Sequence, residues 1–158
     1  MNTDTHTADE ELAAQPVAYW TDITHKEVIG FIRGQLAELG LSQPQYWLLR
    51  HLSAHDLSAD GQGRTVDELA AALREYVQPG DEPVADAEVL LARGWLLRDD
   101  DGQLWITEAG EAARQRVKAA VPRIRADIHR GIDDADYATT VRVLRTMLAN
   151  VRAEPIKA

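Results

Sequence analysis

The chain contains no cysteine, a single phenylalanine and two methionines among its 158 residues. The absence of cysteine excludes disulfide scaffolds, thiolate metal sites, iron–sulfur clusters and cysteine nucleophiles. No uninterrupted apolar run is long enough to cross a bilayer, and the first fifteen residues carry acidic groups where a secretory signal would carry basic ones. We therefore expect a cytoplasmic protein without a membrane partner.

What is present is typical of one globular domain. The sequence is 45% hydrophobic and 27% charged, which is too apolar for general disorder, and its length fits a single domain. A nucleophile elbow, a phosphate-binding glycine loop and a dinucleotide fingerprint are all missing from the sequence. We therefore expect a protein that is not an enzyme and needs no cofactor.

The charge is unevenly distributed along the chain. The net charge is −9, and residues 81–106 alone contain seven acidic and two basic side chains. Residues 107–131 reverse this balance, with six basic and three acidic side chains. Because nucleic-acid-binding domains usually present a basic face, this one positive stretch is relevant to function.

Hydrophobic spacing predicts a mainly α-helical chain. Residues 1–16 are polar and unpatterned, so we expect a mobile tail, with a second short tail at 153–158. Apolar residues at steps of three and four predict helices at about 17–40 and 42–54, and the loop that follows is rich in Asp, Ser and Gly.

Residues 65–107 predict two short helices followed by a β-hairpin. A capping box at Thr65–Glu68 opens the first helix, and the second helix ends at Gly94. Two apolar strands then flank an Asp-Gly turn signal at 101–102. We expect Trp95 and Trp105 to face each other across this hairpin.

Two further helices complete the prediction. The first is long and basic, begins at Thr107–Glu108, and should be kinked rather than ended by Pro122. The last carries apolar residues at alternating steps of four and three: Tyr137, Val141, Leu144, Leu148 and Val151. Such a stripe packs along another helix, and a monomer of this size offers little surface for it, so we expect a homodimer.

Two short helices joined by a turn and followed directly by a hairpin describe a winged helix-turn-helix. Residues 65–113 resemble the MarR family of bacterial transcriptional regulators. The matching landmarks are Glu68-Leu69-Ala70, Leu91-x-x-Gly94-x-Leu96, Arg98 at the wing entry, and Ile106-Thr107-Glu108-Ala109-Gly110 leaving the wing. With the flanking helices included, the resemblance covers roughly residues 17–152.

The resemblance implies a winged helix-turn-helix with a small β-hairpin wing, flanked by N- and C-terminal dimerisation helices. It implies a DNA-binding head at 42–107 and a helical dimerisation region at 17–41 and 108–152. The homodimer would place two recognition helices in successive major grooves of a pseudo-palindromic operator on double-stranded DNA. Regulators of this family often bind a small aromatic effector between the dimer region and the head.

The candidate DNA contacts lie in the predicted head. They are Arg64, Thr65, Arg74, Val84, Arg93, Arg98 and Gln103. Further along, Arg114, Arg116 and Lys118 either flank a bound duplex or are solvated charges that balance an acidic protein.

The candidate ligand pocket is aromatic. Trp20, Tyr46 and Trp47 could supply its walls and His51 a polar handle; the alternative is that these side chains pack in the core. His51 and His55 lie four residues apart, a spacing that could serve a metal ion, but no further ligands are evident and we expect no metal site.

The predicted wing has an acidic tip, Arg98-Asp99-Asp100-Asp101-Gly102, where the family usually carries an Asp-x-Arg-Arg element. Three carboxylates would be repelled by phosphates, because affinity for the DNA backbone comes from Lys and Arg. The first two turns of the predicted recognition helix also lack the polar and basic side chains that commonly read bases. These features favour an alternative hypothesis, a winged-helix protein that binds a basic protein partner instead of DNA.

Overall fold

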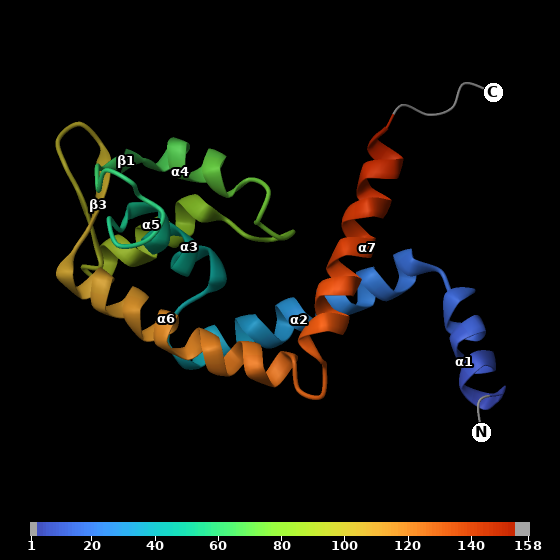
Figure 1. The fold of residues 1–158 in the computed structure, drawn as a ribbon. Coiled ribbons are helices and arrows are strands. Elements are labelled where there is room, and N and C mark those ends of the chain that lie inside the picture. Colours follow the sequence, from blue (N-terminus) through green and yellow to red (C-terminus); the bar gives the residue numbers. More distant parts are fainter. Residues whose placement is uncertain (1–2, 154–158) are drawn as a thin grey trace. The chain divides into compact units, whose positions relative to one another are not determined.

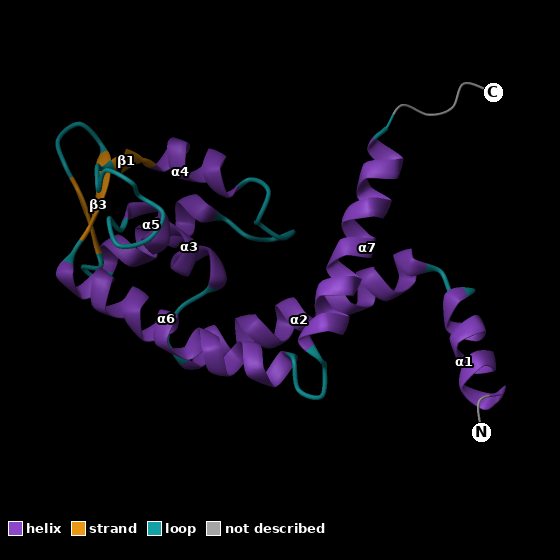
Figure 2. Ribbon diagram, in the orientation of Figure 1, coloured by secondary structure: helices purple, strands orange, loops and turns teal. Residues whose placement is uncertain are grey.

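The computed structural model describes residues 3–153 and contains helices and three short strands in the order drawn in Figure 2. The elements are α1 (Thr3–Ala13), α2 (Val17–Glu38), α3 (Gln43–Leu52), β1 (Arg64–Thr65), α4 (Val66–Leu73), α5 (Pro83–Ala92), β2 (Leu96–Arg98), β3 (Gln103–Ile106), α6 (Glu108–Ile128) and α7 (Asp134–Arg152).

The chain forms two compact units, residues 1–120 and residues 121–158, so that the boundary lies within α6. Among the residues that the structure describes, no helix combines the length and the apolar character needed to cross a membrane.

The N-terminal segment differs from the expected unpatterned tail, because residues 3–13 form helix α1. Residues 8–13, Ala-Asp-Glu-Glu-Leu-Ala, include several strong helix formers, and their side chains are exposed. Local propensity therefore explains this helix better than packing does. The rest of the predicted tails, residues 1–2 and 154–158, lies outside the described residues.

The turn between α2 and α3 follows the sequence signals closely. Gly40 has a φ of +81°, a left-handed conformation that glycine adopts without strain. Ser42 then caps α3 in a capping box: its hydroxyl accepts from the Gln45 amide at 3.2 Å, and the Gln45 side chain accepts from the Ser42 amide at 3.1 Å. The predicted start of α3 is confirmed.

A leucine-rich core joins α3, α4, α5 and the strands, which lie close together in Figure 1. Its fully buried members are Leu48, Leu49, Leu69, Leu73, Leu90, Leu96 and Leu104. Burying such side chains contributes roughly 1.5–3 kcal/mol each relative to exposure. This core fixes α5 and the hairpin against α3 and α4.

The sheet has one strand more than the predicted hairpin. Its order is β1-β3-β2, all antiparallel, and the two residues of β1 pair with Leu104 and Gln103. The pairing places Leu97 opposite Trp105, so the expectation that Trp95 faces Trp105 is wrong. Strand β1 is too short to give a periodic sequence signal, and the register of the hairpin follows from its turn, where the Asp99 amide donates to the Gln103 carbonyl at 3.0 Å.

In the unit formed by residues 121–158, α6 continues through Pro122 to Ile128 and α7 follows after a short turn. Asp133 caps α7 by accepting from the Ala135 amide at 2.8 Å. The Tyr137 ring lies 4.3 Å from the His129 ring, centroid to centroid. Helix α7 has no fully buried residue among those described.

Candidate nucleic-acid interface

Helices α4 and α5 form the helix-turn-helix that the sequence predicts. At the start of α4 the Thr65 hydroxyl accepts from the Glu68 amide, and the Glu68 carboxylate accepts from the Thr65 amide at 2.8 Å. On α5, Ala87 and Leu90 are buried in the core, whereas Val84 is 50% exposed. Helix α5 therefore has one face fixed to the protein and one open to a partner, as a recognition helix requires.

The tip of the wing is built around Asp99. Its carboxylate accepts hydrogen bonds from the backbone amides of Gln103 at 2.8 Å and Asp101 at 3.1 Å. It also accepts from the Trp105 indole at 2.7 Å, and these bonds, that of Trp105 foremost, hold the pKa of Asp99 below its ordinary value. One of the three acidic groups at the tip therefore has a structural role, and Asp100 and Asp101 remain exposed.

The signature residues that leave the wing explain how it joins α6. The Thr107 hydroxyl donates to the Gly94 carbonyl at 2.7 Å and accepts from the Gly110 amide at 3.1 Å. A side chain at position 110 could not fit, because a Cβ there would lie 2.1 Å from the Trp95 carbonyl oxygen. Gly110 thus lets the first turn of α6 pack directly on the chain that enters the wing.

Arg98 occupies the predicted wing entry at the end of β2, but it is not a free cation. Its guanidinium forms an ion pair with Glu88 on the exposed face of α5. Both side chains are substantially exposed, so the pair is screened by solvent and weak. Glu88 was not among the candidate DNA contacts chosen from the sequence.

Arg93 also has a partner within the protein. Its guanidinium donates to the Gly40 carbonyl at 2.5 Å and lies 5.0 Å from the centroid of the Trp95 ring. Most of its donors remain open, since the side chain is exposed. Arg74 is exposed at the end of α4 and forms no ion pair with any residue that the structure describes.

The other predicted contacts are anchored in the sheet. Arg64 and Thr65 form β1, and Gln103 is the Cα partner of Thr65 on β3. Thr65 already uses its hydroxyl in the capping box, and the Arg64 Nε is buried without a hydrogen-bond partner among the described residues. These three are therefore less accessible to a partner than Arg74, Val84, Arg93 and Arg98.

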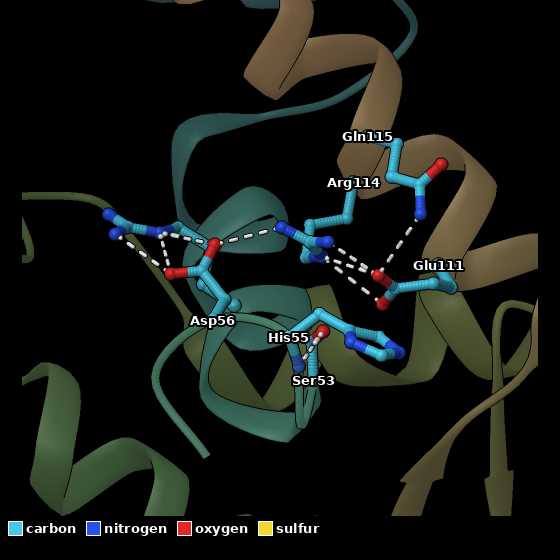
Figure 3. A network of polar contacts seen from close by, with 7 residues as sticks. Ser53, His55, Asp56, Glu111, Arg114 and Gln115 are labelled. Carbon is cyan, nitrogen blue, oxygen red and sulfur yellow. Dashed lines mark hydrogen bonds and ion pairs between the residues drawn. The ribbon is translucent and has the colours of Figure 1, made fainter. Parts of the chain in front are cut away.

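Arg114 contradicts both expectations for the basic stretch, because it is only 2% exposed and so neither faces a duplex nor is solvated. Figure 3 shows its guanidinium between two carboxylates, that of Asp56 at 3.0 Å and that of Glu111 at 2.5 Å. Arg50 approaches the other side of Asp56 at 3.0 Å. The neighbours of Arg114 on α6, Arg116 and Lys118, are exposed, which agrees with either prediction, solvated charges or charges that flank a duplex.

The pKa shifts in this buried network follow from its contacts. Hydrogen bonds from Arg114 lower the pKa of Glu111 from 4.5 to about 2, against a smaller opposing effect of burial. Burial alone would raise the pKa of Asp56, but the bonds and charges of Arg50 and Arg114 outweigh it and lower that pKa. The network clamps the loop after α3 to α6. Sequence reasoning missed Asp56 and Glu111, which have no local motif.

Three of the four candidate ligand residues lie together on α3. The Trp47 ring stacks on Tyr76 at 4.8 Å, and the Arg50 guanidinium lies 4.8 Å from the Trp47 centroid and 5.7 Å from that of Tyr46. Burial lowers the pKa of His51, and nearby arginines lower it further. These rings therefore already have partners within the chain.

Trp20, the fourth candidate, lies on α2. Its indole donates to Gln15 at 2.6 Å, and its ring contacts the Tyr19 ring edge-on at 5.5 Å. No contact joins it to the α3 residues within the described part of the chain.

A groove of about 680 Å³ lies between α2, the start of α3 and α5, and none of the four candidate ligand residues lines it. Arg33 makes a bidentate ion pair with Asp81 at 2.9 and 2.7 Å on one side of it. On the other side, the Asp86 carboxylate accepts from the Ser42 hydroxyl at 2.9 Å and from the side-chain amide of Gln45 at 3.0 Å. These contacts tie the start of α5 to α2 and α3.

Within residues 3–153 no three His, Cys, Asp or Glu side chains gather as a metal site would require. His51 and His55 therefore gain no further metal ligand there. Helix α3 ends at Leu52 and His55 lies in the turn that follows, so the two histidines do not share a helix face.

No protein-family model matches the chain, and no curated protein sequence matches it significantly. Solved structures do match. A MarR family transcriptional regulator from Silicibacter pomeroyi is 23% identical, aligns over 96% of this chain and 100% of its own, and gives a TM-score of 0.66. The reduced form of MarR from E. coli is 17% identical over 85% of this chain and 94% of its own, with a TM-score of 0.64. CouR from Rhodococcus jostii RHA1, solved with p-coumaroyl-CoA bound, is 21% identical over 92% and 97%, with a TM-score of 0.60.

At these identities the likeness shows the fold. The chain has the winged-helix fold of the MarR family regulators, with a small sheet as its wing, and the resemblance predicted from the sequence is confirmed at that level.

Proposed function

We propose that the protein is a DNA-binding transcriptional regulator that acts as a homodimer on a pseudo-palindromic operator. The observation that carries the proposal is the exposed face of α5, held by the leucine core between α4 and the wing in a fold that MarR family regulators share. In this reading residues 42–107 form the DNA-binding head, and residues 17–41 and 108–152 form the dimerisation region.

The electrostatics of the head are compatible with DNA once the structure is considered. Exposed cations are available at Arg74 and Arg93 and on α6 at Arg116 and Lys118, and Arg98 joins them when a phosphate displaces Glu88. Asp99 is satisfied by three donors of the wing itself, so the tip is less repulsive than its sequence suggests.

The dimer is supported by apolar residues that this chain leaves exposed. On α7 they include Val141, Leu148 and Val151, and on α2 Val17 and Phe31. A second copy that covers either set of residues would remove its apolar surface from water.

The most specific part of the proposal is that a small aromatic ligand controls DNA binding. It is supported by CouR, which has this fold and binds p-coumaroyl-CoA, and by the aromatic cluster on α3. Because Trp47 and His51 already pack within the chain, a ligand would have to displace Tyr76 or Arg50 from the Trp47 ring.

The test is selection from a randomised duplex pool, followed by titration of the recovered duplexes against salt. We expect a two-fold symmetric site and a steep salt dependence. Arg98→Ala should weaken binding to all sequences and reduce the salt slope by about one. Lys26→Ala, which removes one cation from an exposed ion pair on α2, is the matched control and should leave the slope unchanged.

The second candidate is a protein-interaction module, favoured by the exposed carboxylates of Asp100 and Asp101. The same selection separates the two. No enrichment at low salt, from protein shown to be folded and dimeric, would contradict DNA reading and favour this alternative.

A further inference from the structure

The exposed face of α5 is chemically unusual for a helix that reads bases. Its exposed residues are Val84, Ala85, Glu88, Val89 and Ala92, which span about 140° of the helix, and Ala85 and Val89 lie on the side that also lines the groove against α2 and α3. Val84 is 50% and Val89 40% exposed. Four of these five side chains are aliphatic, and Glu88 is the one polar group among them.

Aliphatic side chains in the major groove match one feature of the base edges. Thymine presents a C5-methyl group there, which alanine and similar apolar groups contact, whereas guanine presents two acceptors that arginine or lysine bind. None of the five outward side chains of α5 carries a donor. The helix can therefore gain affinity from thymine and gains none from the acceptor edge of guanine.

Glu88 contributes to base discrimination by disfavouring one base, guanine, whereas the aliphatic side chains favour thymine. Its carboxylate pairs with Arg98 through Oε1 in the unbound chain, and it faces the bases without that partner once Arg98 turns to a phosphate, as the proposed function requires. The group can accept from a base amino group, but it would be repelled by the O6 and N7 acceptors of guanine. At its own position Glu88 thus rejects guanine rather than selecting it.

We propose that α5 reads its site through thymine methyl groups packed on Val84 and Val89, with Glu88 excluding guanine between them. The inference rests on the proposed function and adds to it the base chemistry that the helix recognises. A site of this kind is rich in thymine where α5 contacts it.

The experiment uses the full-length protein and the duplex recovered by selection. Each thymine is replaced in turn by deoxyuridine, which removes the methyl group and leaves base pairing intact. We expect a loss of about fourfold in affinity for each contacted methyl, the value of one buried methylene-sized group, and no change at thymines outside the α5 contacts.

Two variants assign the effect to the side chains. In Val84→Ser and Val89→Ser the ratio of thymine to uracil affinity should fall to about one at the corresponding position, with folding checked by circular dichroism. Leu57→Ser removes another exposed apolar side chain of the head, outside α5, and should keep the ratio. Glu88→Gln should raise tolerance of guanine at its position.

The outcomes separate this inference from the proposed function. If selection recovers a site and uracil substitution leaves the affinity unchanged throughout, the methyl reading is overturned and the regulator stands. If no site is recovered, the proposed function is contradicted, and this inference is contradicted with it because it depends on DNA binding. A loss that persists unchanged in the valine variants would also contradict the assignment to Val84 and Val89.

Discussion

The leucine core of the head and the apolar stripe of α7 contain similar residues in opposite environments. Leu48, Leu69 and Leu104 are fully buried within the chain, whereas Leu148 is 49% and Val151 78% exposed. The head satisfies its hydrophobic surface locally, so it can fold around its own residues. Helix α7 leaves its stripe exposed, and under the proposed function this stripe is a surface for association with a second copy.

The first prediction tests that division at α7 and has the largest expected effect. Val141→Asp with Leu148→Asp should raise the dimer dissociation constant by more than about a thousandfold, because each change places a charge in an apolar interface and symmetry counts it twice. Sedimentation equilibrium measures the change. Three of the four tryptophans, Trp47, Trp95 and Trp105, lie in the head, so tryptophan fluorescence in a Trp20→Phe background should show the head unaltered.

The control for α7 is Thr139→Asp with Thr146→Asp, which adds the same two charges on the opposite side of the helix. This variant should remain a dimer. Dissociation of the control as well would mean that charge on α7, not its apolar stripe, decides assembly.

The second prediction tests the head at its buried charge network. Arg114→Met should lower the free energy of unfolding by about 3–5 kcal/mol, since it leaves the carboxylates of Asp56 and Glu111 without their shared cation. Urea unfolding followed by tryptophan fluorescence measures this loss. Arg116→Met removes a cation from an exposed position on the same helix and should cost less than about 0.5 kcal/mol.

The third prediction concerns pH and the same network. The pKa of Glu111 is lowered from 4.5 to about 2 in the folded protein, so its contribution is fully present above pH 4.5 and is lost as the pH falls toward 2. The loss amounts to about 3 kcal/mol for this group, and the lowered pKa of Asp56 acts in the same direction.

The measurement for pH is the free energy of unfolding in urea between pH 6 and pH 2, compared with Glu111→Gln. The wild-type curve should fall and converge on that of the variant. Glu108→Gln, at an exposed position in the same turn, should retain the wild-type slope; parallel curves for wild type and Glu111→Gln would remove Glu111 as the source.

Within the head, the sequence predicted best where one local interaction decides the outcome. The capping box at Thr65 and the start of α3 at residue 42 were readable, because each depends on residues close together in the chain, whereas the close approach of Gly110 to the Trp95 carbonyl was not. The α1 helix was missed, since the tail was judged by its polarity rather than by its helix formers.

The candidate site was predicted less well than the fold. Val84 and Arg98 are exposed as expected, but the pairing of Arg98 with Glu88, the burial of Arg114 and the role of Asp99 were not foreseen. Arg98 and Arg114 pair with side chains ten and 58 residues away that only the fold brings to them, whereas Asp99 bonds residues of its own hairpin and was interpreted from the sequence as a charge only.

The sequence by itself determined the order of the helices, their caps, the wing and the uneven distribution of charge, because helix periodicity and turn chemistry are local properties. Only the tertiary structure decided which charges are free. Asp56 and Arg114 are 58 positions apart and meet only when α6 packs beside the loop after α3. A formal charge counts all carboxylates and guanidinium groups equally, whereas folding pairs some of them inside the protein and leaves the others to meet a partner.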